Sequence, residues 1–279
     1  VRRSAGPRDS ADYHAAWLHS IQLTNQALSL DPNHPYAIAQ RGWIDLYYLK
    51  DYAAAARRIE RAMDLDPTHP EILRLTINAL LVYGQLDKSI QLSQHVIDRD
   101  PMCISCLGFL SMTAGSAGDL ALAESTILRM LELDPTDSFA VEFLGDVMLS
   151  KGNPSAALAQ FEQCDDEDQA GILLARAIAH YQLEEMDEFL RLRERLIGLY
   201  GETRPSYVAR LESYAGNIDV AFAWLDRQLA KPKWARVVNY RSSYYANLHG
   251  DPRWNDYLTD YGVSPAQLAE IDFRPSLPF

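Results

Sequence analysis

Small and bulky side chains recur in a fixed order between residues 55 and 164. A small residue is followed four positions later by a mostly bulkier one, and three positions after that by a third residue. Spacings of four and three place such a set on one face of an α-helix. The pattern therefore predicts four equivalent helices that pack closely against a neighbour. The three positions are occupied, in order, by Ala55, Ile59 and Ala62; Ser89, Ser93 and Val96; Ala123, Ile127 and Met130; and Ala157, Phe161 and Cys164.

Two kinds of helix break alternate with these segments. Asp-Pro dipeptides place prolines at 32, 67, 101 and 135, with steps of 35, 34 and 34 residues between them. Proline lacks the N–H that a helix interior needs and biases the preceding residue away from helical dihedrals, so each dipeptide is a stop. Gly, Asp or Asn forms a second break roughly midway, at 50–51, 84–85, 118–119 and 152–153. Each repeat is therefore predicted to be two short antiparallel helices joined by a tight turn.

Start signals follow the stops. Residues 68–71 have the form of a capping box, in which Thr68 caps the next helix and Glu71 bonds back to it. Pro35 and Pro70 suit the first helical turn. Further helices are expected at 13–30, as the second member of a first pair, and in two later pairs, 173–183 with 187–199 and 205–214 with 220–229.

The C-terminal part follows a different pattern. Asp251-Pro252 and Ser264-Pro265 each have the sequence of a helix start, and 272–279 holds two prolines and is expected to be extended. A solenoid needs an atypical terminal element over its last apolar face, and Trp254, Tyr257 and Leu258 are expected to supply it.

The expected fold is therefore all-α, a right-handed superhelical solenoid of about six to seven antiparallel helix pairs with a short helical C-terminal cap. Residues 1–11 are expected to be a disordered tail or linker, 12–248 the solenoid, and 249–279 the capping helices and extended tail. The chain begins Val-Arg-Arg without Met. We interpret it as a piece of a larger protein.

The joint recurrence of stop, turn and small residue resembles the tetratricopeptide repeat (TPR). That pattern also has Gly or Ala midway along the first helix, a place that here holds Gly42 and Gly145 but Ile77 and Ser111 in the intervening repeats. Residues 42–55, 221–225 and 250–262 are similar to the C-terminal TPR region of bacterial regulators in which a TolB-like segment precedes the repeats. One extra residue before the turn in 42–55 accounts for the 35-residue step.

The resemblance implies a sensory or protein-contact region. In that family the N-terminal output domain is often a winged-helix DNA-binding domain, and in related proteins an adenylate cyclase or a protein kinase. This chain carries no such domain, so the resemblance leaves the output activity open.

Charge limits the partners. The formal net charge is −12, with a sequence pI near 5.0. Nucleic-acid affinity depends on Lys and Arg contacts to phosphates, so no direct nucleic-acid binding is expected, and an anionic membrane surface is equally disfavoured. The longest apolar run, 75–83, is about half the ~20 residues that a bilayer requires. We expect protein or basic-peptide partners and a cytoplasmic location, or a periplasmic one if the parent protein has an upstream membrane helix.

Few residues are spaced for chemistry. Cys103 and Cys106 are a candidate redox or metal pair, but zinc needs about four ligands, and two small residues at a helix start is the favoured interpretation. His34 and His69 precede equivalent prolines and are interpreted as loop residues. The acidic run 165–168 lacks the pattern of an EF-hand calcium loop and is interpreted as a solvated loop. We predict no catalytic residue, no metal site and no cofactor.

The candidate binding surface is the inner wall, lined by the first helix of each pair. Aromatic and Met side chains there suit an extended or helical peptide. The alternative is that half of these residues pack between neighbouring repeats. Projected from the repeat register, the surface carries Tyr36, Trp43, Arg74, Asn78, Phe109, Met112, Phe139, Glu142 and Asp146.

These observations favour a non-catalytic protein–protein interaction scaffold, as the C-terminal sensory or partner-binding region of a larger bacterial signalling or transcriptional regulator. One alternative is a free-standing TPR adaptor that assembles a cytoplasmic or envelope complex. Another is an enzyme with an unrecognised helical site, for which the segment 233–245 offers Arg236, Asn239, Arg241 and Tyr244. The sequence predicts neither the partner's identity nor the oligomeric state.

Overall fold

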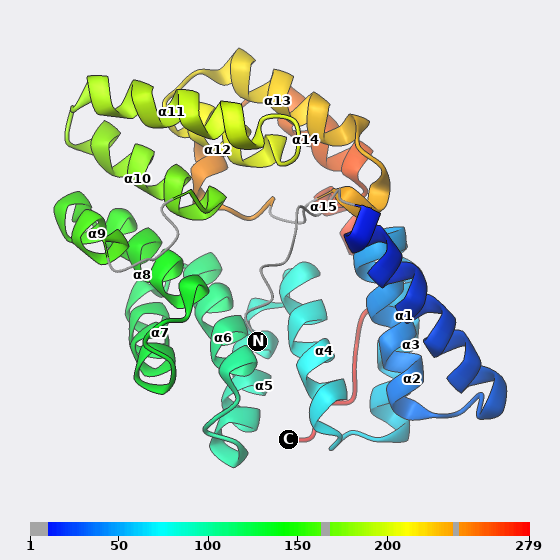
Figure 1. Cartoon of the computed structure of the whole chain (residues 1–279). Coiled ribbons are helices and arrows are strands. Elements are labelled where there is room, and N and C mark those ends of the chain that lie inside the picture. The colour runs from blue at the N-terminus through cyan, green and yellow to red at the C-terminus, as the bar shows by residue number, and fades with distance from the viewer. Residues whose placement is uncertain (1–10, 163–167, 237–239) are drawn as a thin grey trace. The chain divides into compact units, whose positions relative to one another are not determined.

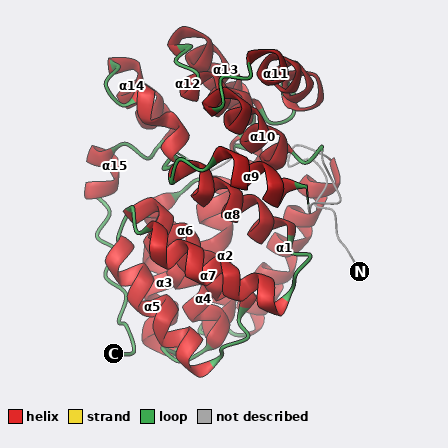
Figure 2. Cartoon of the chain, turned by 90° about the vertical axis from the view of Figure 1, so that its left-hand side faces the viewer, coloured by secondary structure: helices red, strands yellow, loops and turns green. Residues whose placement is uncertain are grey.

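The computed structural model describes residues 11–162, 168–236 and 240–279, and every regular element in these ranges is a helix (Figures 1 and 2). The helices α2 to α13 follow one another in sequence as pairs, and the first five pairs pack tightly helix against helix, which confirms the predicted all-α architecture. The pairs are α2 (Pro35–Ile44) with α3 (Tyr52–Leu65), α4 (Pro70–Val82) with α5 (Leu86–Arg99), α6 (Ile104–Ala117) with α7 (Leu120–Leu133), α8 (Ser138–Ser150) with α9 (Pro154–Phe161), α10 (Ala170–Gln182) with α11 (Met186–Tyr200), and α12 (Pro205–Tyr214) with α13 (Ile218–Ala230).

The remaining helices flank these pairs. The helix α1 (Ala11–Leu30) precedes them, as expected for the second helix of a first pair. The short 3₁₀ helices η2 (Lys233–Ala235) and η3 (Ser243–Leu248) follow, and then α14 (Pro252–Tyr261) and α15 (Pro265–Ala269). Both of the last two helices begin at the predicted prolines, and Ser264 and Gln267 form the capping box of α15.

The chain forms two compact units. The first comprises the described residues within Val1–Arg99, Leu229–Val238 and Asn255–Phe279, and the second those within Asp100–Gln228 and Asn239–Trp254. The helices α1 to α5 thus belong to the first unit with the C-terminal segment, and α6 to α12 to the second. The expected boundaries of a 12–248 solenoid and a 249–279 cap stay a prediction, and residues 1–10 of the expected linker lie outside the described residues.

The two helices of a pair approach each other at the predicted small positions. Ala55, Ser89, Ala123, Ala157 and Ala221 have no exposed surface. In a close-packed interior an added methylene at such a place forces side chains off their rotamers or moves the backbone. In the pair of α10 and α11 the buried Phe189 takes the equivalent position, which shows that one pair reaches its packing with a large residue instead.

The glycines midway along the first helix serve the same packing. A Cβ on Gly145 would lie 2.0 Å from the ring of Phe161, and a Cβ on Gly42 would lie 2.9 Å from Ile59. In the pair of α4 and α5 the equivalent positions carry Ile77 and Ser93, both fully buried. In this pair the larger side chain therefore lies on the first helix and the smaller one on the second, which accounts for both departures from the TPR pattern in that repeat.

The inter-helix turns share one backbone device. Each contains a residue in the left-handed region, and the amide of the next residue bonds back to a carbonyl in the last turn of the first helix, as in the bond from the Gln85 N–H to the Leu80 oxygen at 2.9 Å. This is the geometry of a Schellman-type helix end. The residues with positive φ are Lys50 (56°), Gly84 (76°), Gly118 (83°), Gly152 (76°), Glu184 (61°) and Gly216 (80°).

The extra residue of the 35-residue step is absorbed as a π-helical turn, η1 (Asp45–Leu49), at the end of α2. A π-turn closes with a bond over five residues, so it accommodates one residue more than an α-turn without moving the helices on either side. Its first residue, Asp45, is 1% exposed and forms ion pairs with Arg41, at 3.4 Å, and with Arg58.

Two details of the helix starts differ from the prediction. Thr68 does not cap α4: its hydroxyl bonds to Asp66 at 3.3 Å, and His69 is the N-cap residue. The Nδ1 of His69 accepts the N–H of Glu71 at 3.2 Å. His34 caps α2 in the same way. An imidazole nitrogen accepts a free N–H at a helix start just as a hydroxyl does. Because Pro70 is the first residue of α4, the capping residue is His69, one position after Thr68.

The turn geometry predicts opposite effects of two substitutions. We expect Glu184→Gly to raise the free energy of unfolding by about 1 kcal/mol. Glycine adopts the left-handed conformation without the steric strain that Glu184 has there, and the exposed Glu184 side chain buries little surface. We expect Gly216→Ala to lower it by about the same amount, although no atom lies within 4 Å of the added Cβ. Urea unfolding of both variants measures this. If both substitutions change the free energy of unfolding in the same direction, this explanation of the turns is wrong.

Candidate binding surface

In the first unit, the predicted surface residues already have partners within the unit. Asn78 is only 4% exposed, and its side-chain oxygen accepts a hydrogen bond from the Tyr47 hydroxyl at 2.5 Å. Trp43 is half-buried, with its ring centroid 4.3 Å from that of Tyr47. Asn78 therefore follows the packing alternative rather than the ligand-binding one.

The other two residues of this unit lie nearer the surface. The Arg74 guanidinium bonds to Glu71 on the same helix through Nε at 3.0 Å and through NH2 at 2.8 Å. The ring of Tyr36 stacks on that of His69, with centroids 5.5 Å apart. An ion pair between partly exposed side chains three residues apart contributes little to stability.

The second unit carries the aromatic part of the surface. Phe139, at 36% exposed, and Phe143 lie one turn apart on α8 and stack with centroids 5.4 Å apart. Their rings rest against α6 at Gly108 and Gly115, where added Cβ atoms would lie 3.6 and 3.8 Å from ring carbons. Each ring therefore packs between repeats with one side and keeps some solvent-exposed surface. The half-buried Phe109 and Met112 lie on α6.

The acidic part of the predicted surface begins at Glu142, which lies between Phe139 and Phe143 on α8. The Glu142 carboxylate reaches the start of α10, where a Cβ on Gly171 would lie 1.9 Å from it. The Gln169 side-chain amide donates to its Oε2 at 3.2 Å. A side chain at position 171 would take this space and displace the carboxylate, so Gly171 leaves room for Glu142.

Asp146 lies one turn after Glu142 on α8 and contacts Tyr244, which belongs to the last segment of the second unit. Its Oδ1 accepts a hydrogen bond from the Tyr244 hydroxyl at 2.6 Å. Arg210 on α12, at 5% exposed, is its charged neighbour, and the guanidinium lies 4.1 Å from the centroid of the Tyr207 ring. The buried Nε of Arg210 has no hydrogen-bond partner among the described residues.

The environment holds both carboxyl groups toward their neutral forms. Burial raises the pKa of Glu142 to about 7, with the charge of Asp146 adding and those of Arg210 and Arg204 opposing. Burial likewise raises the pKa of Asp146 to about 6, against the hydrogen bond from Tyr244 and the charge of Arg210. Both side chains keep part of their surface accessible to solvent, so the cluster is a partly open site and not a closed core.

Arg210 occupies the equivalent repeat position on α12, although the projected register does not include it. Counting six residues back from the turn residue with positive φ reaches Asn78, Met112 and Asp146, which the register does include, and also Arg210. The Asp-Pro stops fade after Gly152, so the projection ends before α12. The turn at Gly216 is a sufficient signal to extend it.

The other candidate sites of the sequence come out differently. Cys103 and Cys106 lie at the start of α6, as the favoured interpretation has it, but a disulfide joins them, as in the alternative of a redox pair. A spacing of three residues brings both sulfurs to one side of a helical turn. Within the described ranges, no group of three or more His, Cys, Asp or Glu side chains is placed to hold a metal ion.

The proposed polar segment 233–245 disperses into separate contacts. Arg236 donates to the carbonyls of Leu229, at 2.6 Å, and Lys231, at 3.0 Å, and so closes its own loop. The guanidinium of Arg241 lies 5.0 Å from the centroid of the Tyr240 ring, and Asn239 lies outside the described residues. Residues 165–167 of the acidic run and Cys164 also lie outside them. No helix in the described ranges combines the length and apolarity of a membrane span.

Comparison with known proteins shows the kind of repeat. Residues 46–110 match the family model described as "Tetratricopeptide repeat". No curated protein matches the chain. The matched repeats are therefore tetratricopeptide repeats, as the sequence pattern predicted.

Solved structures share the fold at low identity. The crystal structure of the APC/C hetero-tetramer Cut9–Hcn1 is similar with a TM-score of 0.61 and 14% identity, over 87% of this chain and 46% of that one. PilW, described as a widely conserved type IV pilus biogenesis factor, gives 0.60 and 18%, over 70% and 90%. TTC0263, a thermophilic TPR protein of Thermus thermophilus, gives 0.53 and 21%, over 70% and 99%. The chain folds as a TPR solenoid and spans less than half of the Cut9–Hcn1 chain.

The acidic pair predicts a pH-dependent stability. Both folded-state pKa values lie above the ordinary values of 4.5 and 3.8, so the folded state binds more protons between about pH 4 and pH 7. Stability therefore falls as pH rises through this window and levels off above it. We expect the loss of stability across this window to be about 2 kcal/mol smaller in Glu142→Gln than in wild type. One unit of pKa shift corresponds to about 1.36 kcal/mol, and Asp146 causes the rest of the loss.

Denaturant unfolding at pH 5 and pH 8 measures this fall. Glu132→Gln is the control, since Glu132 is an exposed glutamate on the neighbouring helix α7. The explanation is wrong if Glu142→Gln and wild type lose the same stability between the two pH values.

Proposed function

We propose that this chain is a non-catalytic scaffold that binds a basic, apolar-containing peptide segment of a partner protein along the first helices of its second unit. TPR proteins bind proteins or peptides, and they are generally non-catalytic, which is the premise of the proposal. The observation that carries it is the face of α8, where Phe139, Glu142, Phe143 and Asp146 share one side of the helix.

The aromatic half of this face suits an apolar side chain. The Phe139 ring is fixed by its stacking on Phe143 and by its contact with Gly108, so it loses little freedom when a ligand covers it. Rigid aromatic rings with some exposed surface are the usual anchors of protein interfaces. Phe109 and Met112 extend the same apolar area on α6.

The acidic half suits a Lys or Arg side chain. The hydrogen bonds that Glu142 and Asp146 accept from Gln169 and Tyr244 come from neutral groups, and the raised pKa values show that local cations do not fully stabilise the two charges. A cation from a ligand would supply that stabilisation. The net charge of −12 favours the approach of a basic segment over long range.

Peptide selection tests the ligand class. We expect a random peptide library panned against the full chain at pH 8 to enrich sequences with Lys or Arg beside an aromatic or aliphatic residue. Glu142→Gln and Asp146→Asn should each weaken binding of such a peptide about tenfold, which corresponds to ~1.4 kcal/mol. Binding should also tighten from about pH 5.5 to pH 8, because Glu142 ionises across that range.

Two variants sharpen this test. Glu132→Gln removes an exposed carboxylate of α7 and should leave binding unchanged. Gly171→Ala keeps both charges but displaces the Glu142 carboxylate, and should weaken binding as Glu142→Gln does. Enrichment of acidic sequences, or binding insensitive to both α8 substitutions, would rule out the proposed ligand class.

We further propose that the chain is the C-terminal sensory or partner-binding region of a larger bacterial signalling or transcriptional regulator. Two features support this. The π-helical turn η1 gives the extra residue of segment 42–55 a defined structural place. The closing segment 250–262, which is similar to that of the regulators, forms α14 with Trp254, Tyr257 and Leu258 each 7% exposed.

The coding sequence upstream of Val1 tests the regulator assignment. An open reading frame that continues into a winged-helix, cyclase or kinase domain is the expected result. A stop codon directly upstream with no such domain would refute the assignment, and a signal peptide there would favour the free-standing envelope adaptor instead.

A further inference from the structure

The C-terminal segment crosses the first unit as an extended chain. Residues 271–279 form no helix or strand and run beside α3 and the turn between α4 and α5. Phe273 is 1% exposed, and its ring centroid lies 4.7 Å from that of Tyr83. Pro275 is also buried, whereas Arg274 and Ser276 between and beside them are exposed. One aromatic residue and the proline two positions later therefore anchor the segment.

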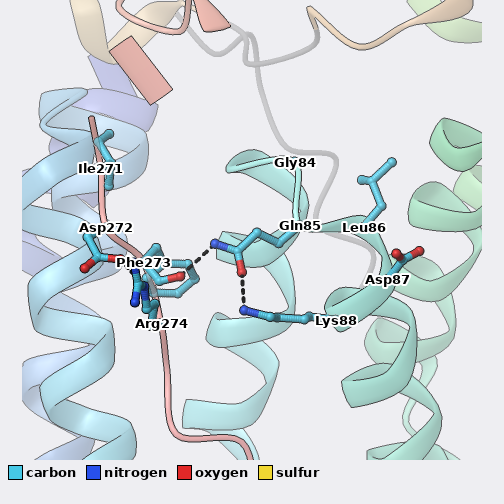
Figure 3. A pocket seen from close by; sticks show the side chains of 9 residues that line it. All are labelled: Gly84, Gln85, Leu86, Asp87, Lys88, Ile271, Asp272, Phe273 and Arg274. Carbon is cyan, nitrogen blue, oxygen red and sulfur yellow. Dashed lines mark hydrogen bonds and ion pairs between the residues drawn. The ribbon is translucent and has the colours of Figure 1, made fainter. Parts of the chain in front are cut away.

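The hydrogen bonds of this segment are made largely to its main chain. The Gln85 side-chain amide donates to the carbonyl oxygen of Phe273 at 2.7 Å, and Lys88 holds that amide by donating to its oxygen at 2.9 Å (Figure 3). Glu60 on α3 accepts the backbone N–H of Arg274. Bonds to backbone groups do not depend on the ligand's side chains, so any extended peptide with an accessible N–H and carbonyl at this place can make them.

The contacts recur every three residues. After Phe273, the Ser276 hydroxyl donates to Asp64 at 2.8 Å, and the ring of Phe279 lies 5.4 Å from that of His95. Pro275 is buried as well, so the contacts are spread along the segment and are not confined to one side of it. Prolines at 275 and 278 restrict the backbone before binding and lower the entropy cost of ordering the segment.

The segment does not fill the space that it occupies. A pocket of about 420 Å³ lies between residues 84–88 and 271–274, next to the Phe273 anchor (Figure 3). Phe279 at the end is 59% exposed. One buried ring, one buried proline and a few hydrogen bonds have to offset the ordering of residues 271–279. The tail groove is formed by Glu60, Asp64, Tyr83, Gln85, Lys88 and His95.

We propose that the tail groove is a recognition site for extended segments with an aromatic residue two positions before a proline, and that residues 271–279 are its ligand in cis. The occupant that displaces them is a partner segment of the same chemistry, with an aromatic anchor that packs against Tyr83 in place of Phe273 and a hydroxyl or amide donor for Asp64. This site is separate from the face of α8, and neither proposal depends on the other.

A labelled peptide with the sequence of residues 271–279 tests the groove in the full chain. We expect weak binding to wild type, where the tail competes, and at least about tenfold tighter binding to Phe273→Ala, whose own tail lacks its anchor. The same peptide with Ala in place of the phenylalanine at 273 should not bind. Glu270→Ala is the matched control: it removes an exposed side chain just before the segment and should bind as wild type does.

Three results would overturn the proposal. The first is a folded Phe273→Ala chain, with wild-type circular dichroism, that binds the peptide no better than wild type. The second is undiminished binding when Gln85→Ala is added to Phe273→Ala. The third is a wild-type dimer that the peptide dissociates, because the occupant would then be the tail of a second copy.

Should Phe273→Ala fail to fold, hydrogen exchange in the wild-type chain decides the question. Excess peptide should accelerate exchange of the Arg274 amide, which Glu60 protects, by releasing the tail. Unchanged exchange at saturating peptide would also overturn the proposal.

Discussion

The close approach of the two helices within each pair is the constraint on which the rest of the structure depends. In five of the six described pairs it is met by a small residue five positions after the turn residue, and in all six by a turn that reverses the chain with one residue in the left-handed region. Where the constraint is met with different residues, the partners change together. Ile77 with Ser93 and Gly145 with Phe161 are opposite solutions, because the packed volume of a pair is limited while the side that carries the bulk is not.

Because packing uses the second helices and one side of the first, the remaining side of the first helices is available for other side chains. In the second unit it carries Glu142, Asp146 and Arg210, whose burial is electrostatically unfavourable. A fold selected only for stability would favour apolar or exposed residues there, since partly buried carboxyl groups with raised pKa values destabilise the native state at neutral pH. Sites that conflict with the local rules of stability are where function is expected.

Much of the fold could be predicted from particular residues. The Asp-Pro stops and midway turns located the helices as far as α9, and Pro205, Pro252 and Pro265 each mark the first residue of a later helix. The errors were local. His69 rather than Thr68 caps α4, since the choice of cap depends on where the backbone leaves the helix and not on residue preference alone. The disulfide could not be predicted because spacing alone does not distinguish a bonded pair from two small residues.

The sequence by itself determined the repeat, the pairing of the helices and the extra residue before Lys50, because periodicity and backbone-restricting residues act locally and leave a regular trace. Only the tertiary structure decided that this extra residue becomes a π-turn, that the charge of Arg210 acts on Asp146, that Tyr244 donates a hydrogen bond to Asp146, and that Phe273 lies against Tyr83. The three pairs are 64, 98 and 190 positions apart in the chain. They follow from how each unit closes on itself, and no local pattern in the sequence encodes which distant side chain fills a given space.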